Sequence, residues 1–494
     1  MLALMAVGGA MGCAEFGDPP AACDAPWVAV GGGASDRGVV LAASLPEGVV
    51  AVVADCAAQT CTFDERPLHG PDGERLPAGT PVLVSGDARH AVALDDEGRL
   101  LHWNLDEDAA FGADESPLAL EVTALVAPLR SGATFLVRDA EGASWAYRAG
   151  SRVLAPLAGP ALHVVTVGDR HVLLERIVDG ERRDLFVVDT SAPLPAPEPL
   201  ASDVRVPTSV EFAPGDAALA VTVPGDAAET FVFVSDGDGA FDLADRFVGT
   251  LTTSRGGMSI SGLASFSADA ASLLYEGPEG GLALRELAGA ASCTLWPAIE
   301  DRVGAAGITP TGRIYFERVT SDGRDLAVFS PSGGIEGLTH GASLRLFAVP
   351  EGDDAPPWAV GVADGAFFGA GASSTPQYLP HRRVSFLPAA GRLFAVIARD
   401  NDAPTAELGD RELLVVQLDR PQAEPGTPDP TWASPRPVIA RRPDGTERAF
   451  LRALARSERV CVAGRFPEPW ARRCGEVGSD GFLVGTLGLE DEGP

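Results

Sequence analysis

Residues 308–341 read ITPTGRIYFERVTSDGRDLAVFSPSGGIEGLTHG, and this stretch decides the fold. Alternating apolar and β-branched residues predict strands at 314–318, 325–329 and 335–339. The two segments between these runs, 321–324 and 330–334, carry the Asp-Gly, Pro and Gly residues that are typical of tight hairpin turns. The stretch therefore predicts consecutive antiparallel strands joined by short turns.

The same unit recurs along most of the chain. Each copy has an apolar residue, a turn with Pro, Gly or Asp, and then a run of alternating apolar residues. Successive copies begin 39 to 54 residues apart, at Leu83, Val126, Val165, Phe212, Phe266, Ile308, Phe347 and Phe386. A period of this size is typical of four-stranded propeller blades, because only a ring of such small sheets buries both faces of each. We predict an all-β fold, a single β-propeller of seven or eight four-stranded blades, with eight preferred. A pair of β-sandwich domains is the alternative.

The turns of residues 308–341 also resemble a known family. Thr309-Pro-x-Gly312, Asp322-Gly-Arg324, Gly333-Gly334 and Leu338-Thr-His-Gly341 follow the order seen in the repeats of TolB-like β-propellers. The resemblance covers about one blade clearly and three more in part. It implies a propeller in a bacterial exported protein, and it implies no specific activity, because these turns are structural devices. The chain lacks the Asp that this family carries in the first turn of the blade.

Composition excludes one class of partner. The 494 residues carry 38 basic and 69 acidic side chains, every basic one an arginine, and the formal net charge is −31. Such a surface repels phosphate backbones, so we expect no nucleic-acid partner. Hydrophobic residues at 46% and charged residues at 22% are ordinary values for a globular chain.

The first residues predict export. Residues 1–13 form an apolar segment that ends in Ala10-Met-Gly-Cys13, which is similar to the bacterial lipobox in which the cysteine is lipidated. We expect residues 1–13 to be a signal peptide with Cys13 as the lipid acceptor, 14–25 a tether, and 26–494 the propeller, with a Pro-rich loop near 420–443. Soluble export and a cytoplasmic location are the alternatives.

The remaining cysteines favour an oxidising compartment. Cys56 and Cys61 are five residues apart, and Cys461 and Cys474 are thirteen apart, so each pair suits a local disulfide. Zinc is the rival use, but the spacing is not of the CxxC type and no histidine is near. Among six cysteines the partners of Cys23 and Cys293 stay open.

Residues with catalytic or metal-binding potential are few. The sequence has no nucleophile elbow, no phosphate-binding loop and no two histidines at i, i+2 or i, i+4. Asp236, Asp238 and Asp242 alternate with glycine and other residues in a pattern that suits a calcium loop. The competing interpretation is a hairpin turn, since Asp-Gly pairs favour positive φ. We expect no catalytic residue and no cofactor apart from this candidate calcium site.

These observations favour a non-enzymatic binding scaffold. We expect a monomeric propeller, attached to the bacterial cell envelope through its N-terminal lipid, that binds an envelope protein or a small ligand. One alternative is a propeller enzyme of the lyase or glycoside hydrolase type with carboxylates in the channel. The other is a structural envelope protein that acts through divalent cations. We further expect a strand from 26–54 to close the ring against a strand from 458–487, where both segments carry apolar runs.

Overall fold

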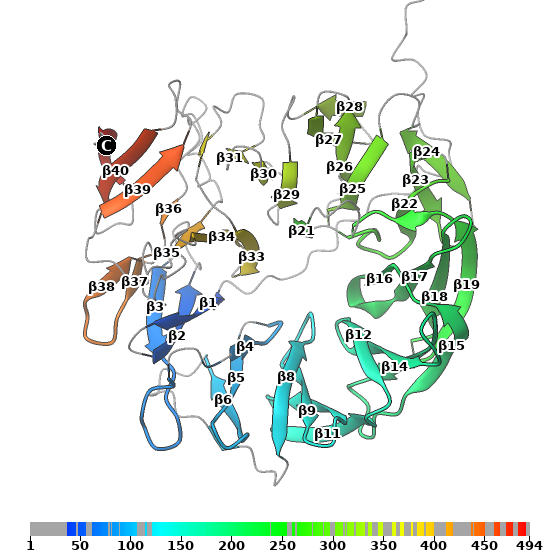
Figure 1. Cartoon of the computed structure of the whole chain (residues 1–494), viewed down its shortest axis with the longest axis horizontal. Coiled ribbons are helices and arrows are strands. Elements are labelled where there is room, and N and C mark those ends of the chain that lie inside the picture. Colours follow the sequence, from blue (N-terminus) through cyan, green and yellow to red (C-terminus); the bar gives the residue numbers. More distant parts are fainter. Residues whose placement is uncertain are drawn as a thin grey trace, which may run out of the picture.

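The computed structural model describes the strands of the chain and its best-defined connections (Figure 1). The described residues are 37–45, 48–55, 62–77, 80, 82–87, 89–105, 114–115, 121–237, 239–253, 259–261, 264–278, 280–289, 291–296, 302–309, 312, the strands from 314 to 490 whose bounds are given below, and the turn 442–446. No helix among them is long and apolar enough to cross a membrane.

Seven antiparallel four-stranded sheets form most of the molecule. They are β4 (Val82–Val84), β5 (His90–Leu94), β6 (Leu100–Asn104) and β7 (Asp114–Glu115); β8 (Val122–Pro128), β9 (Thr134–Asp139), β10 (Ser144–Arg148) and β11 (Val153–Ala158); β12 (His163–Val167), β13 (His171–Ile177), β14 (Arg182–Asp189) and β15 (Glu198–Arg205); β16 (Ser209–Phe212), β17 (Ala218–Val223), β18 (Glu229–Ser235) and β19 (Phe241–Val248); β20 (Thr250–Leu251), β22 (Ser272–Glu276), β23 (Leu282–Glu286) and β24 (Ser292–Trp296); β25 (Arg302–Ile308), β26 (Ile314–Thr320), β27 (Gly323–Ser330) and β28 (Gly334–Gly337); β33 (Arg383–Ala389), β34 (Arg392–Arg399), β35 (Glu412–Gln417) and β36 (Arg436–Pro437).

Three further sheets complete the described strands. They are β1 (Arg37–Leu45), β2 (Gly48–Asp55), β3 (Thr62–Pro67), β37 (Ile439–Arg441) and β38 (Glu447–Ala449); β21 (Ser259–Ser261), β29 (Leu344–Ala348), β30 (Trp358–Gly361), β31 (Ala366–Gly369) and β32 (Gln377–Tyr378); and β39 (Arg459–Gly464), β40 (Ala471–Val477) and β41 (Leu483–Glu490). The sheet of β21 is unusual, because this short strand leaves the blade of β20 and β22 and pairs in parallel with β29.

The sheets follow one another around a common centre, which makes the molecule an all-β propeller (Figure 1). The first strand of each sheet lies nearest the centre, and β1 contacts both β4 and β33. This arrangement confirms the expected fold class. The seven four-stranded sheets are consistent with seven or eight blades, and the blade number stays a prediction.

Hydrophobic cores lie between neighbouring blades, as closure of a ring requires. Val92 and Leu100 of one sheet pack with Phe135 and Tyr147 of the next. Five similar clusters join the successive sheets from β1–β3 to β25–β28 within the described residues. The middle strands are buried on both faces, and every residue of β17 is buried. The alternating apolar pattern of the sequence thus places one row of side chains in each of two adjoining cores.

The ring closes differently from our expectation. The outer edge of β3 pairs in parallel with β37, where Asp64 lies opposite Arg441. Strands β39, β40 and β41 form a separate sheet, and no described strand from 26–54 pairs with them. The end of the segment that we expected as a Pro-rich loop forms β36 and β37 instead. The strand that closes the ring on β3 is therefore β37, and its described contact with β3 is made by the charged residues Asp64 and Arg441. The apolar runs near the chain end do not form this joint.

Candidate functional site

A short motif repeats where the first strand of a blade turns into the second. Gly86-Asp-Ala-Arg-His90 lies between β4 and β5, and Gly168-Asp-Arg-His171 lies between β12 and β13. A Cβ atom at Gly86 would clash with the backbone of Leu129 and Arg130, and one at Gly168 would clash with the carboxylate of Asp216. Both glycines are thus required because the turn of another blade approaches their Cα atoms closely.

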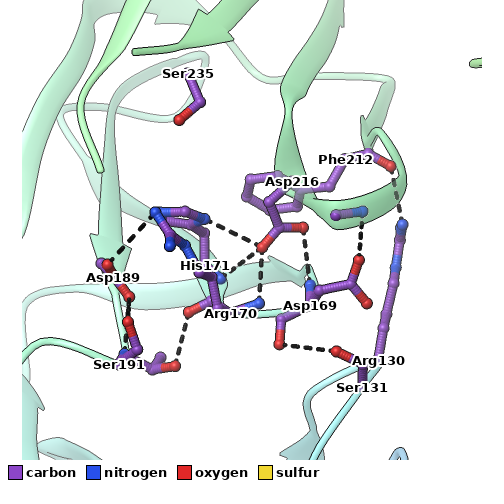
Figure 2. A network of polar contacts seen from close by, with 12 residues as sticks. Arg130, Ser131, Asp169, Arg170, His171, Asp189, Ser191, Phe212, Asp216 and Ser235 are labelled. Atoms are coloured by element: carbon purple, nitrogen blue, oxygen red, sulfur yellow. Dashed lines mark hydrogen bonds and ion pairs between the residues drawn. The ribbon is translucent and has the colours of Figure 1, made fainter. Parts of the chain in front are cut away.

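The Asp216 side chain binds the second of these turns (Figure 2). It is the last residue of the short 3-10 turn Pro214–Asp216 after β16, and its side chain reaches back to the β12–β13 turn of the preceding blade. Its Oδ1 accepts the backbone N–H of Asp169 at 2.8 Å, and its Oδ2 accepts those of Arg170 at 2.7 Å and His171 at 2.8 Å. The imidazole Nδ1 of His171 lies 3.1 Å from Oδ2. One carboxylate therefore accepts hydrogen bonds from three successive backbone N–H groups of the neighbouring blade.

The environment keeps this carboxylate charged. Burial by itself raises the pKa of Asp216, but the hydrogen bonds from the His171 side chain and from the three backbone N–H groups outweigh it, so the pKa lies below its usual range. Asp216 has φ of 57°, in the left-handed region that Asp adopts more readily than most residues. Asp216 and His171 are each only 1% exposed.

The His171–Asp216 pair resembles the orienting half of a catalytic triad, yet its surroundings favour a structural role. The imidazole packs against the rings of both Phe212 and Phe241, with centroid distances of 6.5 and 5.1 Å, and these two rings also contact each other. Its Nε2 is buried and has no hydrogen-bond partner among the described residues. A general base must reach a reacting group, and a pair at 1% exposure offers no such access. We therefore interpret Asp216 as a fastener, by which we mean a side chain whose polar contacts hold two neighbouring blades together.

Similar contacts tie the turns of four successive blades. The backbone N–H of Asp87 donates to Gly132 O at 3.2 Å, and that of Arg130 donates to Gly168 O at 2.9 Å. The Arg130 guanidinium reaches Phe212 O at 2.9 Å. These bonds join four turns in chain order: 85–89 after β4, 129–133 after β8, 168–170 after β12 and 213–217 after β16. We call these four turns the stitched rim. Strand antiparallelism places all four turns on the same face of the ring.

A second fastener joins β19 to β23 of the next blade. Arg285 binds Asp245 through both carboxylate oxygens, with the Nη2–Oδ1 distance at 2.9 Å, and its guanidinium carbon lies 4.8 Å from the centre of the Phe247 ring. The hydrogen bonds from Arg285 hold the pKa of Asp245 below its usual range. Both side chains are largely buried, at 14% and 10% exposure. Such a desolvated bidentate pair contributes more than a surface ion pair.

Replacing Arg285 by alanine is expected to lower the free energy of unfolding by about 1.5–3 kcal/mol, because charge-assisted hydrogen bonds are lost and Asp245 stays partly buried. Arg246→Ala is the matched control. Arg246 also lies over a phenylalanine, Phe231, and pairs with Glu229, but it is 57% exposed. We expect about 1 kcal/mol or less for the control. Urea denaturation measures both, and equal losses would contradict the fastener role of Arg285.

The candidate calcium residues lie at the β18–β19 hairpin. The Asp236 carboxylate accepts the backbone N–H of Ala240 at 3.2 Å, and the Asp236 N–H donates to Ala240 O at 3.1 Å. Gly237 and Gly239 have φ of 90° and 109°, as the hairpin interpretation requires. Asp242 lies exposed on β19, and Asp238 lies outside the described residues. The described contacts thus match the turn interpretation, and a calcium site formed by all three stays a prediction.

The cysteines are placed in part. Cys13, Cys23, Cys56 and Cys61 lie outside the described residues. Cys293, on β24, is disulfide-bonded. Cys461 of β39 is directly opposite Cys474 of β40. Opposed residues of antiparallel strands have Cα atoms about 4.5–5.5 Å apart, within the range that a disulfide spans.

We expect non-reducing mass spectrometry to find the Cys461 peptide linked to the Cys474 peptide, and reduction to release both. The bond should stabilise the protein by about 2–4 kcal/mol through its effect on the unfolded chain. Cys461→Ala and Cys474→Ala should then each cause a similar fall in the denaturation midpoint. Alkylation of both thiols in unreduced protein that has been isolated from an oxidising compartment would contradict the pairing.

Carboxylates are rare in the described first strands of the sheets. Within the described first strands of the sheets, Glu211 of β16 is the one acidic residue. It is 7% exposed and already engaged: Oε1 accepts the Ser265 N–H at 2.7 Å, and Oε2 accepts the hydroxyls of Ser265 at 2.8 Å and Thr253 at 2.6 Å. Glycoside hydrolysis needs two carboxyl groups that flank the substrate. These strands present no such pair.

No known protein family matches this sequence, and no curated protein matches it. Among solved structures it is similar to the β-propeller domain of Cps50 (Swd1) from Myceliophteria thermophila, at 9% identity, with a TM-score of 0.30, covering 57% of this chain and 93% of that one. It is also similar to the Dos1 propeller (12%, TM-score 0.37, 66% and 92%) and to the β-propeller domain of the Trilobed protease from Pyrococcus furiosus (13%, TM-score 0.31, 78% and 99%). Likeness at this level carries no argument about function, and the TolB-like resemblance stays a prediction.

Proposed function

We propose that this protein is a non-enzymatic binding scaffold, exported and attached to the bacterial cell envelope by a lipid on Cys13. Its partner is an envelope protein or a small ligand. The observation that carries the proposal is the stitched rim: buried polar groups that would otherwise suggest chemistry, above all Asp216 and His171, are engaged in holding turns together. A rigid face of this kind binds with little loss of conformational entropy.

The charge of the rim supports the choice of face. Arg89, Arg130 and Arg170 come from three successive turns of the stitched rim, in a chain whose formal net charge is −31. Arg130 is engaged with Phe212 O. Arg170 is 40% exposed and its Nη2 lies 3.8 Å from the Asp189 carboxylate, and Arg89 is exposed. Exposed arginines on a fixed frame suit recognition of carboxylate or phosphate groups. The scarcity of carboxylates in the described inner strands favours this scaffold over the channel-enzyme alternative.

Affinity capture from the native envelope with paired variants tests the binding function. Arg89→Glu combined with Arg170→Glu changes the stitched rim, and Glu97→Arg combined with Glu181→Arg changes exposed turns at the opposite ends of the strands. We expect the first pair to reduce recovery of the bound partner about tenfold or more, and the control pair to retain it. Equal recovery with both pairs would contradict binding at the stitched rim.

The attachment has its own test. A Cys13→Ala variant is expected to move from the membrane fraction to the soluble fraction of the envelope, because one acylated terminus with several chains gives stable membrane attachment. Cys461→Ala, which removes a cysteine of β39 and its expected disulfide but leaves Cys13 in place, is the control and should stay in the membrane fraction. Unchanged fractionation of Cys13→Ala would overturn the lipid anchor without affecting the binding proposal.

A further inference from the structure

Two histidines meet on neighbouring strands of the β4–β7 sheet. Nδ1 of His90, at the start of β5, lies 3.0 Å from Nε2 of His102 on β6, and the ring centroids are 5.1 Å apart. The register pairs His102 with Val92 and His90 with Asn104, so the two histidines are diagonal neighbours on the same face of the sheet. Two ring nitrogens directed at each other share one proton at most, and each has a lone pair in the neutral form.

The surroundings hold this pair in place but leave one side accessible. His102 is 2% exposed, and its ring meets that of Tyr147, from the β8–β11 sheet, edge to face at 5.7 Å. His90 is only partly buried, and it directly follows the exposed Arg89 of the stitched rim. On the other side of β6, the register places Asp114 of β7 opposite His102. The pair therefore lies at an interface between blades, near the surface, with an acidic residue on the adjoining strand.

The two Gly-Asp-containing turns differ in the group that faces their histidine. His171 has the same place in its turn as His90, but its Nδ1 bonds to Asp216, which the next turn of the stitched rim supplies. The corresponding turn after β8 contains Ser131 and Gly132 and no acidic residue. The Nδ1 of His90 thus faces a second imidazole nitrogen, whereas the Nδ1 of His171 faces a carboxylate.

We propose that His90 and His102 chelate a divalent transition-metal ion of the Zn²⁺, Cu²⁺ or Ni²⁺ class, which takes the place of the proton between the rings. Two nitrogens bound tetrahedrally at about 2.0–2.1 Å lie about 3.3 Å apart, a few tenths of an ångström more than the observed 3.0 Å. Imidazole nitrogen suits these ions and does not suit Ca²⁺ or Mg²⁺. This site is distinct from the carboxylate loop around Asp236 and does not depend on the proposed binding function.

Titration of the metal-free protein with Zn²⁺ by calorimetry, followed by Cu²⁺ electron paramagnetic resonance, tests the site. We expect saturable binding in the natural protein and a Cu²⁺ spectrum with two imidazole nitrogens. His90→Ala and His102→Ala should each weaken Zn²⁺ binding about tenfold or more. His163→Ala is the matched control, because His163 is a partly buried histidine on β12, and it should leave the affinity unchanged.

Circular dichroism and the denaturation midpoint establish that each variant is folded. Because His90 is only partly buried, His90→Ala tests the site even if His102→Ala unfolds. Zn²⁺ should also raise the melting temperature of the natural protein and not that of His90→Ala, since a ligand that binds only the folded state stabilises it. The absence of saturable Zn²⁺ binding, unchanged affinity in folded His90→Ala, or a Cu²⁺ spectrum with fewer than two imidazole nitrogens would overturn the proposal.

Discussion

Asp216→Ala is expected to lower the free energy of unfolding by about 3–5 kcal/mol. The variant removes the acceptor for three backbone N–H groups and for the His171 imidazole, all at an interface from which water is excluded. Buried donors that lose their acceptor lose the hydrogen bond and keep the desolvation penalty. Chemical denaturation monitored by tryptophan fluorescence measures the loss.

Asp236→Ala is the matched control for Asp216→Ala. Asp236 also lies in a blade turn and accepts a backbone N–H, that of Ala240, but it is exposed. Because Asp236 is exposed, water can replace the Ala240 N–H as its partner, so we expect a loss of about 1 kcal/mol or less. A similar loss for both variants would show that Asp216 acts only within its own turn and would contradict its role as a fastener between blades.

The same carboxylate gives stability a defined dependence on pH. The pKa of Asp216 is lower in the folded protein than the value of 3.8 for an unperturbed side chain. Its contribution is therefore complete above the unfolded pKa and is lost as the pH falls through the folded pKa. In Asp216→Asn this part of the acid dependence should disappear. Denaturation curves at a series of acid pH values, compared with those of Asp236→Asn, measure the difference.

Arg442→Ala is expected to lower the free energy of unfolding by about 3 kcal/mol, because it acts where the ring closes. The Arg442 Nε lies 3.7 Å from Oε1 of Glu65, whose side chain is 1% exposed. Removing this cation leaves the buried charge of Glu65 without the arginine that faces it across the joint between β3 and β37. The substitution should therefore lower the denaturation midpoint and release β37 from β3, which hydrogen exchange of the two strands detects.

The adjacent pair supplies the control for this prediction. Arg441 and Asp64 face each other across the same joint at 3.4 Å, but they are 67% and 40% exposed. Arg441→Ala should cost about 1 kcal/mol or less, since exposed ion pairs contribute little. Replacing both Glu65 and Arg442 by leucine should restore much of the stability lost in Arg442→Ala. Failure of the double variant to exceed Arg442→Ala would show that the charge of Glu65 is not the cause.

The blades could be predicted from the sequence because their signals are local. The strands expected at 314–318 and 325–329 lie within β26 and β27, and the one expected at 335–339 overlaps β28. Turn residues and alternation act over a few positions, so a single sequence carries them. The expected hairpin at Asp236 has the same basis, and the contacts with Ala240 match it.

The side-chain clusters could not be predicted in this way. His171 and Asp216 are 45 residues apart and in different blades, and His90 and His102 are 12 apart on two strands. Their meeting depends on how the sheets pair and pack, and a search at i, i+2 and i, i+4 examines only one strand or helix at a time. The repeated Gly-Asp dipeptide before Arg and His was the available signal, because glycine at that point marks a close approach of another chain segment.

Closure of the ring was predicted wrongly for a physical reason. The apolar runs in 458–487 indicated that this segment closes the ring, but it forms β39, β40 and β41 of a separate sheet. The closing strand β37 has only three residues and follows a Pro-rich segment. The described side-chain contacts with β3 come from Arg441 at its end and from Arg442 directly after it. Charged residues at the rim of a sheet have no periodic signature, so hydrophobic pattern could not identify this strand.

The sheet that combines β1, β2 and β3 with β37 and β38 also has a consequence for biosynthesis. Asp64 and Arg441, which meet at the joint, are separated by 377 residues. At about 5–20 residues per second, a ribosome needs about 20–75 seconds to make the second after the first. During that interval β3 is an open sheet edge, a template for pairing with other nascent chains. The newly made edge therefore stays available for wrong pairing until β37 emerges from the ribosome.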